Sequence, residues 1–418
     1  MTEKKKILVI ADSPLAPSGV GTQTRYMIES MLRTGEFKFF CLAGAIKHPD
    51  YRLQKVEPWG DDLLIKPVNG YGDPNIVRQV LREFKPDALW FMTDPRFYQW
   101  LWQISSEIRK KIPMIYYHVW DNYPLPIFNK KYYDSNDVIC TISKVTDDIV
   151  RNVSPDVKCV RIPHTVDTKT FSPKEQNTRD NIRQKITQDH EGKTIFFWNN
   201  RNARRKQSGT LIYWFKTFLD RVGRDKAVLV MHTEPKDPNG QDLVAIMENL
   251  GLTDGEVVLS TQKISPDDLS NVYSAVDCTV NISDAEGFGL ATLESLSCAT
   301  PIIVNMTGGL QEQVTDGESW FGVGLNPSSK AVIGSQDVPY IYEDRLNEND
   351  VVQAFETIHN MTPEEREEMG SRGRQHVLDN YGFAQYSGLW YQTFKNIFEE
   401  FGSWEDRKNY KHWSIEEL

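Results

Sequence analysis

The sequence has few cysteines and no long apolar run. Its five cysteines are scattered over 418 residues without the spacing of a disulfide framework or a zinc site, which is typical of reduced core thiols. No segment approaches the ~18 consecutive apolar residues that a membrane-spanning helix needs. Only five consecutive apolar residues, Ile7–Ala11, precede Asp12, too few for a secretory signal. We therefore expect a cytoplasmic protein without a transmembrane segment.

The length of the chain bounds the number of domains, and its net charge bounds the kinds of partner. A chain of 418 residues exceeds the roughly 250–300 residues at which a single hydrophobic core stops growing, so we expect two domains. The formal net charge of −10 argues against a general electrostatic attraction to nucleic acid or anionic lipid, although it is compatible with a local basic groove. No internal repeat or low-complexity tract is visible.

The first part of the chain alternates apolar strands with helices, which predicts a doubly wound α/β domain. Helices are expected over 22–33 and 97–110. Gly19-Val-Gly21 precedes the first helix but lacks the third glycine of a dinucleotide fingerprint, so a nicotinamide site is not expected. The expected strands are Ile7–Ala11, Ala88–Met92, Pro113–His118 and Asp137–Ile142.

The second part of the chain repeats this pattern. Thr194–Trp198 opens a second set of buried strands, and Cys278–Ile282 is another. Thr362-Pro-Glu-Glu365 has the form of a capping box that opens a helix. Beyond Gly382, large apolar side chains recur at helical spacing and predict a long helix with a broad apolar face: Phe383, Tyr386, Trp390, Phe394, Ile397, Phe398 and Phe401.

A glycine-rich turn follows the strand Cys278–Ile282. Gly287 and Gly289 flank Phe288, and Leu290 opens the next helix. The first N–H groups of a helix have no intrahelical partner and lie at the positive end of its dipole. A phosphate or a sugar hydroxyl can therefore dock at this turn, because glycine leaves the approach open.

Two carboxylates bracket the turn. Glu286 precedes the helix and is placed to contact a group bound at the helix amides. Glu294 lies deeper in the helix and can accept hydrogen bonds from hydroxyls such as those of a ribose. In isolation, such a pair is more often a capping acid and a solvated helix residue.

A cationic loop follows the strand Thr194–Trp198. Arg201 and Lys206 stand five positions apart in it, and Arg204 and Arg205 add two more charges. A departing diphosphate gathers negative charge, for which Arg offers a planar fork and Lys a mobile point charge. Without other context, a charge run of this kind is usually a solvated face.

The stretch from Glu286 to Glu294, continued by Cys298-Ala-Thr-Pro-Ile-Ile-Val304 and Gly308-Gly309-Leu-Gln-Glu312, resembles the donor-site signature of retaining glycosyltransferases of the GT-B fold, family 4 (glycosyl transferases group 1). The resemblance is strongest over 269–317. It implies that Arg201 and Lys206 hold the diphosphate of a nucleoside diphosphate sugar. The other donor-binding positions that it implies are Glu286, Gly287, Phe288, Gly289, Leu290 and Glu294.

The resemblance extends, more weakly, to the first part of the chain. Gly19 and Gly21 match a glycine loop that packs near the donor diphosphate in the family. His118, at a strand end, matches a histidine that meets the donor sugar and is implied to be catalytic with Arg201, Lys206 and Glu286. Trp120 and Asp121 follow it and are candidates for the acceptor side. A lone histidine at a strand end is otherwise more often structural.

The family implies two Rossmann-like domains that face a central cleft. We place the N-terminal, acceptor-side domain at 1–173 and the C-terminal, donor-side domain at 174–381. The segment 382–418 is the helix that returns to the N-terminal domain, with a tail of unknown role. The resemblance implies front-face transfer. Neither a metal nor a cofactor is expected, because no Asp-x-Asp pair is present to chelate Mg²⁺ or Mn²⁺. A UDP or GDP sugar is the expected donor.

Several alternatives stay open. A two-carboxylate hydrolase would leave the cationic loop unexplained, whereas a GT-B epimerase or phosphorylase, or a non-catalytic nucleotide-sugar binder, would share the scaffold. The expected acceptor is a saccharide or a lipid-linked saccharide, with a small metabolite as the next choice. A hydroxylated base in nucleic acid is a minority choice, supported only by local basicity around Lys130-Lys131 and 204–206. Peripheral membrane contact through the helix at 97–110 is less expected than core packing.

Overall fold

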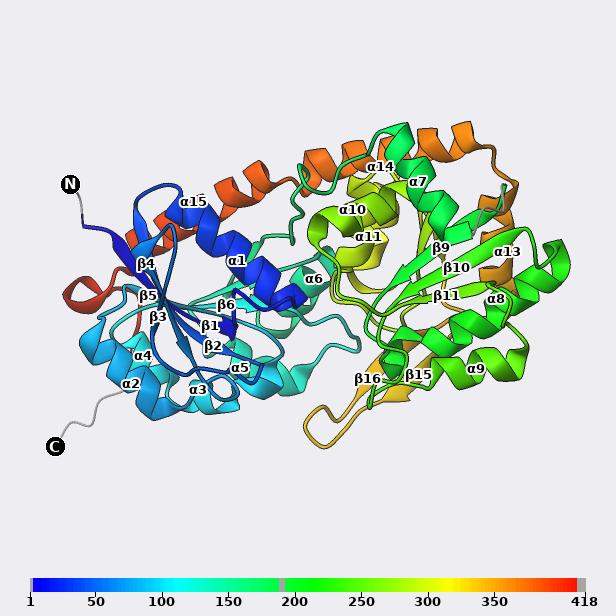
Figure 1. Cartoon of the computed structure of the whole chain (residues 1–418). Helices are drawn as coiled ribbons and strands as arrows, with labels where there is room; N and C mark the ends of the chain where they lie inside the picture. Colours follow the sequence, from blue (N-terminus) through cyan, green and yellow to red (C-terminus); the bar gives the residue numbers. More distant parts are fainter. Residues whose placement is uncertain (1–2, 188–191, 412–418) are drawn as a thin grey trace. The chain divides into compact units, whose positions relative to one another are not determined.

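The structure is a computed structural model that describes residues 3–187 and 192–411 (Figure 1). The chain divides into two compact α/β units. The first comprises Met1–Thr165, Gly334–Pro339 and Ala384–Leu418, and the second comprises Val166–Ile333 and Tyr340–Phe383. Residues 412–418 of the predicted tail lie outside the described residues.

The first unit is built on an eight-stranded sheet of order β3-β4-β2-β1-β5-β6-β7-β8, parallel throughout except for β3 against β4. Helices α1 and α15 lie on one side of it, and α2, α3 and α4 lie on the other (Figure 1). The strands are β1 (Lys5–Asp12), β2 (Phe37–Gly44), β3 (Gln54–Val56), β4 (Gly60–Pro67), β5 (Ala88–Met92), β6 (Met114–His118), β7 (Val138–Thr141) and β8 (Lys158–Arg161). The helices are α1 (Gly19–Leu32), α2 (Pro74–Glu83), α3 (Gln99–Gln103), α4 (Ser105–Arg109), α5 (Lys130–Tyr133), α6 (Lys144–Val153) and α15 (Phe383–Phe401).

The four strands predicted in this unit are confirmed, because each is an apolar run buried on both faces of a parallel sheet. The single helix predicted over 97–110 is wrong. The segment forms two short helices, α3 and α4, separated by Ile104 at φ −105° and ψ 11°. The buried Tyr98 hydroxyl lies 2.7 Å from the carbonyl oxygen of Ile10 and 2.8 Å from that of Met92. Tyr98, anchored in this way, lies between a 3₁₀ turn, Pro95–Phe97, and α3, so the α-helix begins only at Gln99.

The long C-terminal helix completes the core of the first unit. The Trp390 ring of α15 packs edge to face on Trp90 of β5, with the ring centroids 5.9 Å apart. Phe394, one turn further on, lies 5.6 Å from the Phe37 ring of β2. The apolar face predicted for this helix therefore covers the middle of the sheet.

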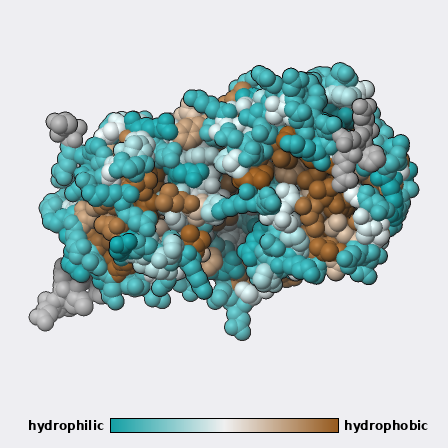
Figure 2. Space-filling view, viewed as in Figure 1, coloured by the Kyte–Doolittle hydropathy of each residue, from teal (hydrophilic) through white to brown (hydrophobic). Residues whose placement is uncertain are grey.

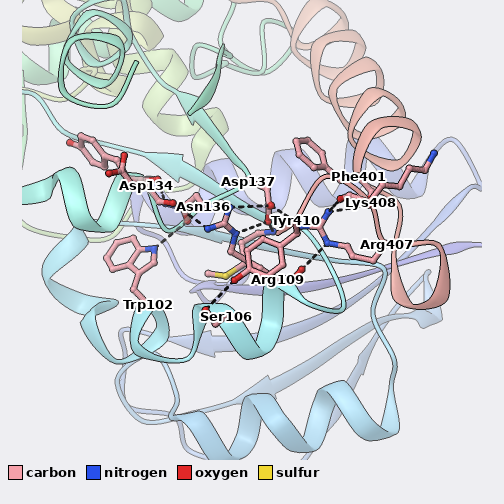
Figure 3. Close-up of polar contacts among 12 residues, drawn as sticks. Trp102, Ser106, Arg109, Asp134, Asn136, Asp137, Phe401, Arg407, Lys408 and Tyr410 are labelled. Atoms are coloured by element: carbon pink, nitrogen blue, oxygen red, sulfur yellow. Dashed lines mark hydrogen bonds and ion pairs between the residues drawn. The ribbon is translucent and has the colours of Figure 1, made fainter. Parts of the chain in front are cut away.

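The segment after α15 is fixed to the first unit by a buried carboxylate (Figure 3). Asp137, which precedes β7, accepts a 2.7 Å hydrogen bond from Nη2 of Arg407, and it pairs at 3.2 Å with Nε of Arg109. The side chains of Asp137 and Arg407 are only 1% and 5% exposed. The Tyr410 hydroxyl donates to Ser106 of α4 at 3.0 Å. The tail through Tyr410 is thus part of this unit's structure.

The second unit is built on a six-stranded parallel sheet of order β11-β10-β9-β12-β13-β14. Phe215, Phe218 and Phe355 pack on Phe196 of β9 with ring centroids 4.8 to 6.0 Å away. The strands are β9 (Thr194–Asn199), β10 (Ala227–His232), β11 (Val257–Ser260), β12 (Cys278–Asn281), β13 (Ile302–Asn305) and β14 (Gly322–Leu325). The helices are α7 (Gln176–Thr187), α8 (Ser208–Val222), α9 (Leu243–Leu250), α10 (Pro266–Ala275), α11 (Leu290–Ser297), α12 (Gln311–Val314), α13 (Glu348–Asn360) and α14 (Pro363–Asn380).

A two-stranded antiparallel hairpin, β15 (Ser329–Ile333) and β16 (Ile341–Arg345), stands apart from both large sheets. The sequence does not predict it. Its loop end, which Figure 2 shows as hydrophilic, is the segment Gly334–Pro339, which groups with the first unit.

The observed unit boundaries differ from the predicted ranges. The chain crosses between the units after Thr165 and after Phe383, rather than after 173 and 381. The segment that follows Thr165 packs within the second unit, because the Phe171 carbonyl accepts a 2.6 Å hydrogen bond from Ser297, and the Phe171 ring lies 6.2 Å from that of Tyr273.

Candidate functional site

Three loops of the second unit leave the sheet at its carboxyl edge. They follow the adjacent strands β9, β12 and β13, and they carry the cationic loop, the glycine turn and Gly308-Gly309 respectively. In open parallel sheets this edge is where ligands bind. The structure therefore brings Arg201, Lys206 and Glu286, predicted from separate segments, to one edge.

The glycine turn is folded tightly around the start of α11. Gly289 has φ 93°, and a Cβ there would lie 2.5 Å from Cδ2 of Leu310. Gly309 approaches from the next loop, where a Cβ would lie 2.7 Å from Cα of Phe288. Phe288 itself is buried, and its ring packs edge to face on Tyr381. Glycine is thus required here for close packing.

Helix α11 begins at Leu290 without a capping side chain. Gly289 is its N-cap residue, no side-chain hydrogen bond caps it, and its first turn holds no acidic residue. The amides at the start of a helix attract anions when no side chain occupies them. This end of α11 can therefore receive an oxygen of a phosphate.

Two cations of the loop after β9 are held by carboxylates outside the glycine turn. Arg201, 64% exposed, forks onto Asp237 with hydrogen bonds of 2.6 and 3.1 Å. These hydrogen bonds lower the pKa of Asp237 to about 2. Arg204 forks onto Glu343 at 2.6 and 2.9 Å.

The other two cations of the loop face the glycine turn. Arg205 donates to the carbonyl of Ala285 at 2.5 Å. Lys206 forms an ion pair with Glu286, and both side chains are largely buried. Burial acts to raise the pKa of Glu286, but the charges of Lys206 and Arg205 outweigh it and hold that pKa below its usual value. Glu286 is therefore ionised and neutralises Lys206.

Glu294 lies on α11, away from these cations. Burial raises its pKa to about 7, although a 3.0 Å hydrogen bond from the Tyr273 hydroxyl acts in the opposite direction. A carboxyl group with this pKa exchanges its proton near neutral pH. Glu294 differs in this respect from Glu286, which is only eight positions away in the sequence.

Two amide side chains that the sequence analysis misses hold these loops in shape. The buried Gln313 donates to the carbonyls of Phe288 and Gly289 at 2.7 and 3.1 Å, and it accepts from the Thr292 hydroxyl at 2.7 Å. The buried Asn202 donates to the carbonyl of Gln241 at 2.7 Å. An isolated amide in a loop has no periodicity or motif that would reveal such a role.

The predicted residues of the first unit lie at the carboxyl edge of its own sheet. Gly19 and Gly21 lie in the first turn of α1, which Ser18 caps through a 3.0 Å hydrogen bond from the amide of Gly21. A Cβ on Gly21 would lie 2.7 Å from the carbonyl oxygen of Ser13, so close packing requires this glycine. The binding role of both glycines stays a prediction.

His118 is fully buried at the end of β6. Its Nε2 lies 2.7 Å from the Tyr133 hydroxyl, and its Nδ1 has no hydrogen-bond partner among the described residues. Burial lowers its pKa to about 3, so the ring is neutral at physiological pH. Trp120 is buried and donates to the carbonyl of Asn122 at 2.8 Å, while Asp121 is half-buried. The roles of these residues likewise stay predictions.

Within residues 3–187 and 192–411, no group of three or more His, Cys, Asp or Glu side chains is arranged to hold a metal ion. No helix in the described part of the chain is both long and apolar enough to cross a bilayer.

Comparison with known proteins bears on the family and the fold of the chain. Residues 178–376 match the sequence model of the family "Glycosyl transferases group 1". A D-inositol 3-phosphate glycosyltransferase of Acidothermus cellulolyticus is 39% identical over 87 residues, which are 21% of this chain and 18% of that protein. The chain therefore spans about a fifth of the length of this curated relative.

Solved structures share the fold over nearly the whole chain. Sucrose-phosphate synthase from Thermosynechococcus elongatus superposes with a TM-score of 0.74 at 16% identity, covering 95% of this chain and 100% of that one. HepE of Anabaena, solved in complex with UDP and glucose, gives a TM-score of 0.68 at 12% identity, covering 94% of this chain and 100% of that one. The predicted GT-B fold is confirmed. Over residues 178–376, the chain is similar to the glycosyl transferases group 1 family.

Proposed function

We propose that this chain is a retaining glycosyltransferase that takes a sugar from a nucleoside diphosphate sugar and passes it to a hydroxyl acceptor. The observation that carries this proposal is the meeting of the Arg201–Lys206 loop, the Glu286 carboxylate and the uncapped start of α11 at one sheet edge. Such an edge offers cations and helix amides to a leaving diphosphate.

The site supplies its own charge stabilisation. As the bond between sugar and phosphate breaks, negative charge grows on the diphosphate, and Lys206 with the amides of α11 is placed to take it up. Diphosphate binding draws Lys206 away from Glu286, so that the freed carboxylate can accept a hydrogen bond from a sugar hydroxyl. Glu294 is placed to accept from ribose hydroxyls. The reaction, as proposed, needs neither a metal nor a cofactor.

The donor is proposed to be a UDP or GDP sugar. UDP is the ligand named for the HepE structure. Phosphorylated sugars or polyols appear in the names of the inositol phosphate and sucrose phosphate enzymes that this chain resembles. Inositol phosphates and hexose phosphates are therefore the first acceptors to offer, followed by other saccharides.

A panel of UDP and GDP sugars, screened by thermal unfolding, tests the proposal. A ligand at a hundred times its dissociation constant stabilises the folded state by about 2.7 kcal/mol, which is readily measured as a rise in Tm. We expect at least one donor to raise Tm in the wild type and to fail in Lys206→Ala. A panel without any shift in the wild type would contradict the proposed function.

A further inference from the structure

The hairpin β15–β16 has no part in either large sheet, yet its second strand ends in three residues that are all tied to the candidate donor site. These are Glu343, Asp344 and Arg345, consecutive in β16 (Figure 1). In a strand, successive side chains point to opposite faces, so three consecutive residues do not ordinarily contact the same site. Here each of them contacts a loop that leaves the carboxyl edge of the six-stranded sheet.

Glu343 holds the loop after β9. Its two carboxylate oxygens accept hydrogen bonds of 2.6 and 2.9 Å from Arg204. The Glu343 side chain is only 4% exposed, so this bidentate pair is anchored at its acidic end. Arg204 lies two positions before Lys206 in a single 3₁₀ turn, and fixing one fixes the backbone that presents the other.

Asp344 holds the loops after β12 and β13. Its amide donates to the carbonyl of Asp284 at 2.9 Å. Its carboxylate accepts from the Thr307 hydroxyl at 2.7 Å, and its carbonyl accepts from the Asn305 side chain at 3.1 Å. Asp284 is two positions before Glu286, and Thr307 directly precedes Gly308-Gly309. One residue therefore joins the glycine turn to the loop that packs on it.

Arg345 closes the network. Its Nη1 donates to Asp284 at 2.6 Å, and its Nη2 donates to Glu343 at 2.9 Å. The two carboxylates are 3% and 4% exposed. Arg345 thus bridges Glu343, which holds Arg204, and Asp284, which lies just before the glycine turn. Gln207 of the cationic loop also donates to Asp284, at 2.5 Å.

We propose that Glu343, Asp344 and Arg345 form a positioning clamp that sets the relative places of Lys206, Glu286 and the start of α11. None of the three is proposed to touch the donor. They act through Arg204, Asp284 and Thr307, and Arg345 is the central member. The inference rests on the proposed function, since it assigns the clamp to a nucleoside diphosphate site.

The test compares Arg345→Ala with Arg224→Ala. Arg224 is a matched control because it also pairs with a buried carboxylate of the second unit, Glu256, at 3.3 Å, but near the amino end of β11. We measure amide hydrogen exchange of the three loops, Tm, and the affinity for UDP and GDP by calorimetry. If Arg345→Ala does not fold, the same measurements are made on Glu343→Gln and Arg345→Lys, which change the side chain less.

We expect exchange to speed up in 203–207, 283–288 and 305–309 together in Arg345→Ala, and in none of them in Arg224→Ala. Nucleotide affinity or turnover should fall by about 10- to 100-fold, the effect of misplacing binding groups by about 1 Å. Arg345→Lys should recover part of the loss, because it keeps the charge but not the fork.

Amide exchange in these loops that is the same in Arg345→Ala as in the wild type would overturn the clamp. So would a loss of nucleotide affinity in Arg224→Ala equal to that in Arg345→Ala, if both variants lower Tm equally. A wild-type chain that binds no nucleoside diphosphate would instead overturn the proposed function, and with it the assignment of the clamp to that site. The exchange data separate the two failures, because they do not depend on any ligand.

Discussion

Lys206 and Glu286 are 80 positions apart in the chain and form an ion pair at the carboxyl edge of the second sheet. The cation proposed to bind a diphosphate is thus already neutralised by the acid proposed to bind the sugar. An incoming diphosphate has to compete with Glu286 for the Lys206 ammonium. Under the proposed function, donor binding and the release of Glu286 are therefore coupled.

Glu286→Gln should increase the affinity for a bare nucleoside diphosphate and decrease sugar transfer. The neutral amide no longer competes for Lys206, but it is a poorer acceptor for a sugar hydroxyl. Calorimetry with UDP and GDP, together with turnover of the donor found in the screen, measures both effects. Glu256→Gln, the same change at a distant buried carboxylate, is the control. A drop in diphosphate affinity would contradict the proposed competition.

Lys206→Ala and Arg201→Ala should each lower turnover by about 10²–10³, the usual effect of losing one charge-stabilising donor. Arg201 has to leave Asp237 to act, so the Arg201 variant also tests whether this exposed ion pair opens. Initial rates at saturating acceptor measure the loss. Lys216→Ala removes a lysine that pairs with Asp220 on α8 and should leave the rate unchanged. Full activity in both site variants would contradict the assignment of the diphosphate site.

Glu294 should make the free energy of unfolding fall as pH rises from about 4.5 to about 7. Its pKa is about 7 in the folded chain, against 4.5 ordinarily, so in this window the folded state binds more protons than the unfolded state. Glu294→Gln removes the titrating group, so the variant gains stability relative to the wild type as pH increases.

Urea unfolding of both proteins at pH 5 and pH 8 measures this difference. Glu248→Gln, at an exposed position of α9, should reproduce the wild-type pH dependence. An identical pH dependence in wild type and Glu294→Gln would show that Glu294 titrates normally.

Gln313→Ala should destabilise the second unit by about 2–3 kcal/mol. The substitution leaves the carbonyls of Phe288 and Gly289 without this donor and removes one of the two acceptors of the Thr292 hydroxyl, all in a buried setting. Denaturant titration measures the loss. Gln375→Ala, which removes an exposed contact with Asp379, is the matched control and should change stability by less than about 0.5 kcal/mol. Equal effects of the two would contradict the role assigned to Gln313.

Arg407→Ala should destabilise the first unit by about 3 kcal/mol, because it removes one partner of a buried ion pair and leaves Asp137 with Arg109 as its cation within residues 3–187 and 192–411. Thermal unfolding, followed separately for the two units, measures this effect. Arg372→Ala breaks an exposed pair with Glu368 on α14 and should have almost no effect. If Arg407→Ala leaves the stability of the first unit unchanged, the segment after α15 does not stabilise that unit.

The sequence predicts the elements whose signal is local. The strand Cys278–Ile282, the glycine turn and the start of the following helix are found within a residue or two, because an apolar run and a glycine pair mark them directly. The capping box at Thr362 is confirmed with both of its hydrogen bonds. The apolar face of α15 is predicted from its periodicity and is found on the first sheet.

The features that the sequence does not reveal depend on long-range contacts. The hairpin β15–β16 has a half-exposed strand, Ser329–Ile333, without an apolar alternation that would mark it. The partners of Arg201 and Arg204 come from distant segments, so their pairing with Asp237 and Glu343 has no local trace. The break between α3 and α4 at Ile104 has no marker in the sequence either.

The packing of Trp390 on Trp90 has a consequence for biosynthesis. These rings are 300 positions apart (390 − 90 = 300), so at about 5–20 residues per second a ribosome needs about 15–60 s to deliver the second after the first. During that interval the nascent first sheet lacks the cover of α15, whereas the second unit has been translated almost completely. The face of the first sheet that carries Trp90 therefore cannot be buried under α15 until the second unit has been translated.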